Sequence, residues 1–161
     1  MIVYHGSTLQ IKNPDLTHSK YNLDFGVGFY TTTISTQAER WAKRKGMRLS
    51  LPAVVNVYEI DDFKSFRLKR FDGADKEWLQ FVVDCRNGSE VYKDYDIIIG
   101  NVADDDVFKC VNMFMDSIWD EERTLKEISF FEKNDQIAFL SQQAIDDLLR
   151  FKESYEVTVD D

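Results

Sequence analysis

Short runs of apolar residues, many of them β-branched or aromatic, recur along the chain and predict β-strands. The clearest is AVVNVYEI at residues 53–60, and DIIIG at residues 96–100 is apolar enough to be buried on both faces. Residues 6–27 contain proline, asparagine and glycine and are predicted to be mostly loop. The predicted strands cover residues 1–5, 29–33, 53–60, 63–71, 96–100, 136–140 and 154–159.

Between these runs, apolar residues spaced by three or four positions predict helices. The first is expected to be capped by Ser35 or Thr36 and to end at Gly46. Asp75 can cap the second, and the carboxylates of residues 104–106 complement the dipole at the start of the third. The predicted helices cover residues 35–45, 75–85, 104–118, 121–130 and 142–149.

The order of these elements indicates the fold class. Strands dominate the beginning, helices the middle, and strands return at the end, so the strict alternation of a doubly wound sheet is missing and an α+β fold is favoured. The length of 161 residues fits one domain with a core of its own. No repeat or linker divides the chain, so residues 1–161 are expected to form a single domain.

Charge narrows the classes of partner. A net charge of −9 and a pI near 4.7 oppose binding of nucleic acid over a broad surface, because its phosphates would be repelled. A local basic patch at Lys43, Arg44, Lys45 and Arg48 is compatible with substrate contact, although such a cluster is more often a solvated helix face. The chain shows neither an apolar run long enough for a membrane span nor a secretory signal, so we expect a cytoplasmic protein that binds no membrane.

Metal and cysteine sites are weakly supported. The two histidines, His5 and His18, and the two cysteines, Cys85 and Cys110, do not show the spacing of zinc ligands, and the cysteines lie on predicted apolar helix faces. We therefore expect no metal. The carboxylates of residues 104–106 leave a magnesium or calcium site as an alternative, although they lack the spacing of a calcium loop.

The segments YHGS at residues 4–7 and DFGVGFYTT at residues 24–32 indicate a binding site most strongly. Their glycines allow the backbone to approach a ligand closely. A histidine, an aromatic face and accessible backbone amides around one cleft suit a flat, polar heterocycle with an attached sugar, which predicts a nucleotide site. Gly26 and Gly28 do not make a phosphate loop, because the P-loop lysine is missing and a strand follows. Ser7 lacks the strand-turn-helix elbow of a nucleophilic serine.

These two segments resemble motifs of the ADP-ribosyltransferase superfamily. YHGS looks like the first motif of its His-Tyr-Glu class, and FGVGFYTT looks like the second, with the helix predicted from residue 35 following it as in those enzymes. More narrowly, the chain resembles a family of small uncharacterised bacterial proteins placed in that superfamily, with further matches such as QAERWA at residues 37–42 and YDIIIG at residues 95–100. The resemblance implies a split β-sheet sandwich with flanking helices and an NAD cleft between two roughly perpendicular sheets.

The resemblance also implies roles for individual residues. His5 would hydrogen-bond the 2′-hydroxyl of the nicotinamide ribose, Gly6 would offer its backbone to the carboxamide, and Tyr30 would stack on the nicotinamide ring, because an aromatic face stabilises a planar cation. Ser7 and Gly28 would also contact the cofactor. The structural alternatives are a strand-end histidine satisfied by the backbone at position 5 and a core aromatic at position 30. Trp41 and Trp78 are expected to be core anchors rather than stacking platforms.

The third position departs from the superfamily pattern, which usually carries a glutamate on a late strand. Here the strand reads NDQIAF at residues 134–139, so the matching residue is Gln136 or, after a one-residue shift, Asp135. Only one of the two can face the cleft, because a one-residue shift turns a side chain to the opposite face of the sheet. Gln136 can hold a ribose hydroxyl without supplying negative charge, and its alternative interpretation is a solvated strand residue.

The resulting expectation is an NAD-dependent ADP-ribosyltransferase with His5, Tyr30 and Gln136 as catalytic residues and NAD as the donor substrate. It would act inside the bacterial cell on a protein or nucleic-acid acceptor, as a toxin-antitoxin or phage-defence effector with an antitoxin or inhibitor as partner. A non-catalytic NAD- or ADP-ribose-binding module is the alternative that the neutral Gln136 motivates. A third hypothesis is an acidic surface that binds a basic partner.

Overall fold

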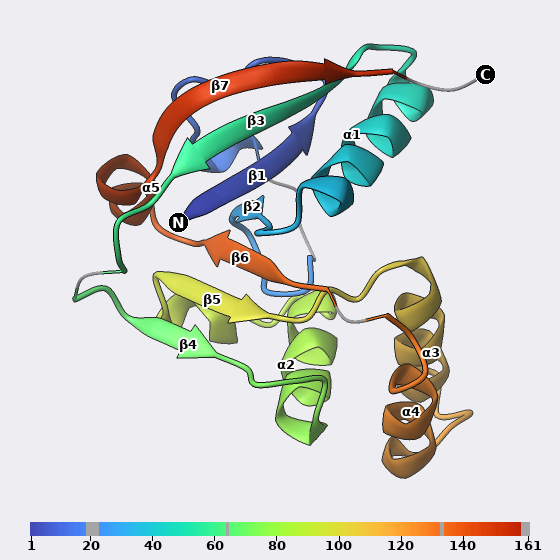
Figure 1. The fold of residues 1–161 in the computed structure, drawn as a ribbon. Coiled ribbons are helices and arrows are strands. Elements are labelled where there is room, and N and C mark those ends of the chain that lie inside the picture. Colours follow the sequence, from blue (N-terminus) through green and yellow to red (C-terminus); the bar gives the residue numbers. More distant parts are fainter. Residues whose placement is uncertain (19–22, 64, 133, 159–161) are drawn as a thin grey trace.

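A computed structural model describes residues 1–18, 23–63, 65–132 and 134–158. The described residues form an α+β fold with five α-helices and two mostly antiparallel sheets (Figure 1). The first sheet has the strand order β1-β3-β7 and is antiparallel throughout. The second sheet has the order β2-β6-β5-β4, in which only β4 and β5 are parallel. The strands are β1 (Ile2–Ser7), β2 (Phe29–Thr31), β3 (Ala53–Glu59), β4 (Leu68–Arg70), β5 (Ile97–Gly100), β6 (Gln136–Phe139) and β7 (Arg150–Val157).

The two sheets meet at one antiparallel bridge between Tyr4 of β1 and Thr32, just after β2. The Tyr4 amide donates to the Thr32 carbonyl at 2.8 Å, and the Thr32 amide donates back at 2.9 Å. The bridge thus joins the two sequence segments on which the site prediction depends. This junction brings the end of β1 beside β2 and β6.

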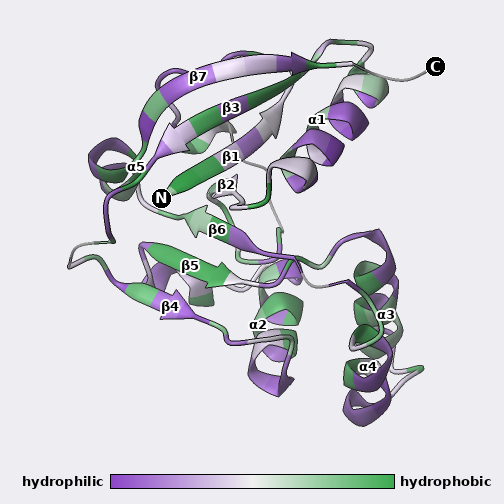
Figure 2. Ribbon diagram, viewed as in Figure 1, coloured by the Kyte–Doolittle hydropathy of each residue, from purple (hydrophilic) through white to green (hydrophobic). Residues whose placement is uncertain are grey.

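The helices flank the sheets on opposite sides (Figure 1). Helix α1 covers the first sheet, while α2, α3 and α4 lie below the second sheet and α5 precedes β7 at its edge. Figure 2 shows that the outward side of α1 is hydrophilic, whereas β5 and much of α2 and α3 are hydrophobic. The helices are α1 (Ser35–Leu49), α2 (Lys76–Arg86), α3 (Asp105–Met115), α4 (Glu121–Ile128) and α5 (Gln142–Leu148), and the 3₁₀ turns are η1 (Leu16–His18) and η2 (Val91–Asp94).

The central strands β5 and β6 of the second sheet are buried on both faces. Ile98 of β5 and Ala138 of β6 face the cluster formed with α2, α3 and α4, whereas Ile97, Ile137 and Phe139 face the cluster between the two sheets. Alternating side chains of one strand point to opposite faces, so a continuous apolar run such as residues 97–99 is what this position requires. The prediction that the strand at residues 96–100 is buried on both sides is confirmed.

Several predicted boundaries were wrong. Helix α1 continues through Gly46 and ends at Leu49, and the next residue, Ser50, has a left-handed backbone conformation. The N-cap position is Ile34, which makes no side-chain cap bond, rather than the expected Ser35 or Thr36. Strand β4 covers only residues 68–70 of the predicted 63–71, and β7 begins at residue 150 rather than 154. The predicted caps Asp75 and Asp104 do accept from backbone amides, at 2.9 Å and 3.3 Å respectively.

Gly6 is required by packing. A Cβ at this position would lie 2.4 Å from the Ala38 carbonyl oxygen and 2.7 Å from the Ala42 amide nitrogen of α1. The small residues Ala38 and Ala42 are fully buried against the first sheet, so the missing side chain of Gly6 lets α1 lie directly on β1. From the sequence, Gly6 was expected to let the backbone approach a ligand. In the structure it also lets the backbone of α1 approach that of β1.

We expect Gly6→Ala to lower the free energy of unfolding by about 1–3 kcal/mol, because the new methyl group overlaps helix backbone that cannot rotate away. Urea unfolding of the purified proteins measures this loss. Gly73→Ala is the matched control, since a Cβ at Gly73 would meet nothing within 4 Å, and its effect should stay within about 0.5 kcal/mol. Equal effects of the two substitutions would contradict this packing.

Within the described residues, every helix is too short or too polar to cross a lipid bilayer.

Candidate functional site

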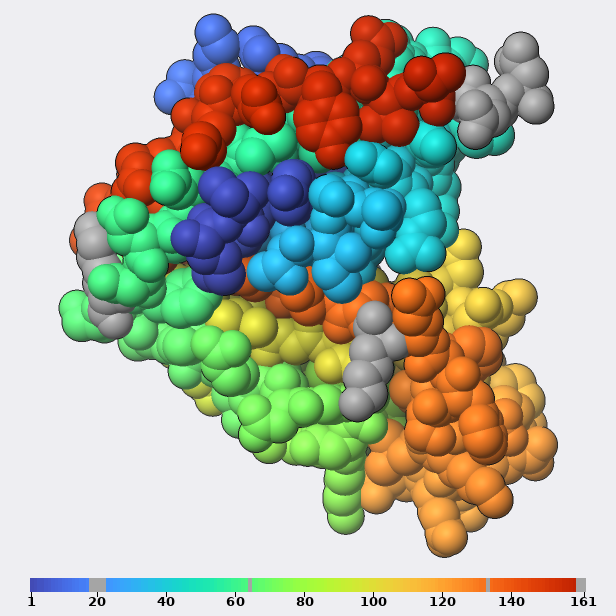
Figure 3. Space-filling view, viewed as in Figure 1, coloured from blue at the N-terminus to red at the C-terminus, as the bar shows by residue number. Residues whose placement is uncertain are grey.

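A cavity of about 370 Å³ opens beside the junction of the two sheets. It lies between α1 on one side and the start of α3 on the other, with β6 below it, and Figure 3 shows α1 side chains above those of the β6 and α3–α4 region on this side of the molecule. Its volume is within the usual range for small-molecule sites. The lining residues are His5, Gly6, Leu23, Asp24, Gly28, Tyr30, Trp41, Arg44, Lys45, Arg48, Arg86, Val102, Ala103, Asp104, Asp105, Phe108 and Gln136.

The structure therefore brings together most of the predicted site residues. His5, Gly6, Gly28, Tyr30 and Gln136 all line this one cavity, although they come from three separate segments of the sequence. Ser7 is buried and is not among the lining residues. The predicted contact of Ser7 with a bound cofactor is therefore not supported by the lining of this cavity.

His5 is held by the backbone of β2. Its Nδ1 lies 2.6 Å from the Tyr30 carbonyl oxygen, and its ring stacks on Phe29 with 4.1 Å between ring centroids. Because a carbonyl can only accept, Nδ1 must carry the proton, and the neutral tautomer then has its acceptor at Nε2. The ring is buried and fixed in orientation by these two contacts. The interpretation of His5 as a backbone-bonded strand-end residue is thus confirmed, whereas ligand contact through Nε2, which is buried, stays a prediction.

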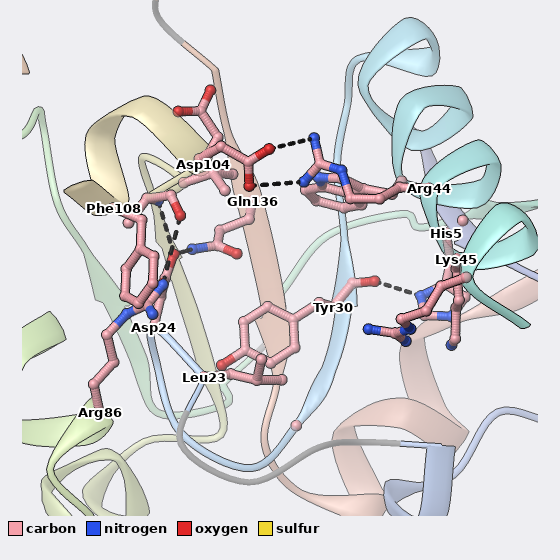
Figure 4. A pocket seen from close by; sticks show the side chains of 17 residues that line it. His5, Leu23, Asp24, Tyr30, Arg44, Lys45, Arg86, Asp104, Phe108 and Gln136 are labelled. Atoms are coloured by element: carbon pink, nitrogen blue, oxygen red, sulfur yellow. Dashed lines mark hydrogen bonds and ion pairs between the residues drawn. The ribbon is translucent and has the colours of Figure 1, made fainter.

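Tyr30 offers a ring face and not a free hydroxyl. Its hydroxyl donates to the Gly26 carbonyl at 2.6 Å and accepts from the Phe25 amide at 3.0 Å; Figure 4 shows the ring at the cavity wall. Burial, and then the nearby carboxylate of Asp24, raise the pKa of Tyr30 well above its ordinary value, so the phenol stays protonated. The half-buried ring is thereby locked in place, where it can stack on a ligand but cannot act as an acid or base at neutral pH.

We expect Tyr30→Phe to destabilise the protein by about 1–3 kcal/mol, because the Gly26 carbonyl and the Phe25 amide lose their partner. The aromatic face remains, so affinity for a stacked ligand should change by less than about threefold. Thermal unfolding and calorimetric titration measure the two effects separately. A large loss of affinity would show that the hydroxyl itself contacts the ligand.

Gln136 and not Asp135 belongs to the cavity. Gln136 pairs with Gly100 of β5 at the start of β6 and is only 3% exposed, so the interpretation as a solvated strand residue was wrong. Asp135 instead accepts from the Thr32 hydroxyl at 2.7 Å and from the Thr33 amide at 2.9 Å, where it fixes the chain between β2 and α1. The two alternatives that the sequence left open are thus separated by the register of β6.

Asp24 and Arg86 form a buried ion pair at the cavity wall that the sequence analysis missed. Arg86 Nε donates to Asp24 Oδ1 at 2.9 Å, Arg86 Nη2 donates to the same oxygen, and the two side chains are only 17% and 6% exposed for Arg86 and Asp24 respectively. The Arg86 guanidinium also lies over the Phe108 ring, 3.9 Å from its centroid. Asp24 stands directly before the glycine motif, but nothing in the sequence pairs it with a residue 62 positions away.

The basic residues of α1 reach the cavity mouth. Arg44, Lys45 and Arg48 line it, whereas Lys43 is not among the lining residues. Arg44 spans the mouth to Asp105 of α3 with two nitrogen–oxygen distances of 3.2 Å. Both partners are more than half exposed, so solvent screens this pair strongly and it can open for a ligand at little cost. Trp41 is half-buried and lines the same wall, so only Trp78 is the fully buried anchor that was expected.

The alternative sites have structural explanations. Asp104 caps α3 and accepts from Asn134 Nδ2 at 3.2 Å, while Asp105 is paired with Arg44. No group of three or more histidine, cysteine or acidic side chains suited to a metal ion occurs in the part of the chain that the structure describes; the side chain of His18 lies outside that part. Burial raises the pKa of Cys85 to about 12, so this thiol is not a nucleophile at neutral pH.

A sequence family described as Protein of unknown function (DUF3990) matches residues 1–151. The chain belongs to this family. The DUF3990 match covers every element that contributes to the cavity. The comparison with curated proteins and the comparison with solved structures gave no match for the chain. The function of this DUF3990 protein must therefore be argued from its cavity.

Proposed function

We propose that this protein binds NAD in the cavity and transfers ADP-ribose from it to an acceptor, and that its two sheets form an ADP-ribosyltransferase-like split sandwich. The observation that supports this most is the convergence of His5, Gly6, Tyr30 and Gln136 on one cavity at the junction of the sheets. These are the residues to which the resemblance gave roles, and they come from β1, β2 and β6.

The proposed reaction begins with cleavage of the bond between the ribose C1′ and the nicotinamide nitrogen. The bonding electrons go to the nicotinamide ring, which leaves neutral, and the ribose becomes oxocarbenium-like. A lone pair of the acceptor then forms the new bond at C1′, and the acceptor proton is released. The Tyr30 ring would stack on the cationic nicotinamide, while His5 and Gln136 would hold ribose hydroxyls.

Charge is distributed in a way that suits this donor. Arg44, Lys45 and Arg48 place positive groups at the mouth, where a diphosphate would lie once the nicotinamide riboside is inside. The inner wall, by contrast, has the Asp24–Arg86 ion pair and the neutral amide of Gln136. Asp104 and Asp105 also line the cavity, so the three cations of α1 exceed the carboxylates opposite them by one charge. This positive excess at the mouth and the charge-balanced inner wall match a ligand whose inner half carries a sugar and a ring and whose middle is anionic.

A second candidate is a non-catalytic module that binds NAD or ADP-ribose, and the neutrality of Gln136 favours it. The two are separated by incubating the protein with NAD labelled in the adenine moiety, measuring nicotinamide release, and titrating NAD and ADP-ribose by calorimetry. Release together with label transfer supports the transferase. Binding without release supports the module, and absence of both overturns the proposed function.

The acceptor class can be read from the same experiment. Label transferred from NAD to a bacterial lysate is treated separately with protease and with nuclease, which shows whether the acceptor is protein or nucleic acid. The proposed setting as a toxin-antitoxin or phage-defence effector predicts that expression arrests bacterial growth and that the His5→Ala variant does not. Growth arrest by both proteins would contradict that setting.

A further inference from the structure

The side-chain amide of Gln136 has two neighbours that fix its orientation. Its Nε2 lies 3.0 Å from Asp24 Oδ2 and 3.3 Å from the backbone carbonyl oxygen of Asn101. A carboxylate and a carbonyl can only accept hydrogen bonds, so the NH₂ group of the amide must face them. The Oε1 atom is then directed away from both and toward the cavity that Gln136 lines (Figure 4).

Asp24 is itself held from three sides. Its Oδ2 accepts from the Ala103 amide at 2.8 Å in addition to Gln136, and its Oδ1 accepts from Arg86. The side chain of Asp24 is only 6% exposed, and the guanidinium that neutralises it is stacked on Phe108. The carboxylate can satisfy all of these donors in one position only, so it is a rigid reference for the amide beside it.

We propose that Asp24 is a positioning residue that holds Gln136 with its carbonyl oxygen toward the ligand, so that the cavity presents an uncharged acceptor to a ribose hydroxyl. This inference rests on the proposed function. It explains why the late-strand position carries glutamine: a glutamate there would bring a second carboxylate to about the same 3.0 Å from Asp24, with no proton between them. The carboxylate that contacts residue 136 is instead that of Asp24, which Arg86 neutralises.

The first test needs no ligand. Gln136→Glu is made with Asp24 and, separately, with Asp24→Asn, and the carboxyl group introduced at position 136 is titrated by carbon-13 NMR. With Asp24 present, the midpoint should lie at least about one pH unit above that of an exposed glutamate, because two carboxylates share the site. In the Asp24→Asn background, the midpoint should be lower than in the Asp24 background by a similar amount, about one pH unit or more. An ordinary midpoint in the presence of Asp24 would overturn the pairing.

The second test uses ADP-ribose as the probe in calorimetric titration. With Asp24 present, Gln136→Glu should weaken binding by about tenfold or more, since the buried site must take up a proton or repel its own carboxylate. With Asp24→Asn, the same substitution should strengthen binding, because the asparagine amide can donate to the introduced carboxylate and leave the other oxygen of that carboxylate to the ligand. The Ala103 amide loses a carboxylate acceptor in both proteins that carry Asp24→Asn. The effect of Gln136→Glu is therefore measured against the protein that has Gln136 and the same residue at position 24.

Gln80→Glu provides a matched control, because Gln80 Nε2 donates to Asp84 Oδ1 at 2.9 Å in an equivalent pair on an exposed helix surface. Its effect on ADP-ribose affinity should be below about twofold, with Asp84 or with Asp84→Asn. An effect of Gln136→Glu with the same sign in both Asp24 backgrounds would overturn the proposal. If the wild-type protein binds neither NAD nor ADP-ribose and releases no nicotinamide, the proposed function fails, and the carboxyl titration still decides whether Asp24 orients residue 136.

Discussion

Arg86→Met is expected to lower the free energy of unfolding by about 3–5 kcal/mol, the largest loss of stability that we predict for a single side chain. The substitution keeps an unbranched apolar stem against Phe108 but leaves the Asp24 carboxylate, 6% exposed, without its counter-ion. A buried charge without a partner costs far more than the pair contributed, because the carboxylate cannot regain the water that it lost on folding.

The loss is measured by urea unfolding monitored by circular dichroism, with Arg44→Met as the matched control. Arg44 also contacts a carboxylate through two nitrogen atoms, but the side chains of that pair are 58% and 73% exposed. We expect the control to stay within about 1 kcal/mol of the wild-type protein. Similar losses in both variants would mean that the Asp24–Arg86 pair is open to solvent, and the rigid reference for Gln136 would then be missing.

The contrast between these two pairs shows what the sequence could and could not reveal. Arg44 stands in a visible cluster of basic residues, and the sequence identified that cluster as a candidate for substrate contact. Arg86 is a single cation at the end of an apolar helix, and Asp24 is a single carboxylate beside a glycine motif. Only the packing of α2 against the loop before β2 makes them partners, and no local pattern encodes such a contact.

Local patterns did determine the elements that position the cavity. The runs at residues 53–60 and 96–100 predicted β3 and β5, because β-branched side chains fit a buried pleated surface. The boundaries failed where tertiary contacts overrule local preference. Gly46 was expected to end α1, yet the helix continues to Leu49. Residue 46 is glycine for a tertiary reason, because the returning chain passes so close that a Cβ would lie 2.7 Å from the Leu51 carbonyl oxygen.

The candidate site was predictable to a similar degree. His5, Gly6, Gly28, Tyr30 and Gln136 were named from sequence motifs, and all five line the cavity. The choice between Gln136 and Asp135 required the pairing of β6 with β5, since the motif alone does not fix a register. The orientation of the Gln136 amide required more still, namely the positions of a carboxylate and a backbone carbonyl from two other segments of the chain. Motifs thus located five of the residues that line the cavity, while the contacts that orient them became visible only in three dimensions.

His5→Ala is expected to reduce nicotinamide release from NAD by about 10²–10³-fold, the largest effect on activity that we predict, if the proposed function holds. The imidazole would hold a ribose hydroxyl most strongly as charge develops at C1′, so its loss should appear mainly in kcat rather than in KM. Steady-state assays at saturating and at low NAD concentration separate the two parameters. An unchanged kcat would leave His5 with the purely structural role that the sequence also allowed.

His5→Asn separates the two roles, because Nδ1 contacts the Tyr30 carbonyl oxygen, whereas the proposed ribose contact would use Nε2. An asparagine amide can still donate to the Tyr30 carbonyl, which Nδ1 contacts at 2.6 Å, but it has no atom that reaches the position of Nε2. If His5 only fastens β1 to β2, the asparagine variant should recover most of the stability and most of the turnover that the alanine variant loses. If His5 contacts the ribose, stability should recover while turnover stays as low as in His5→Ala, and it is this divergence between unfolding and kinetics that we expect.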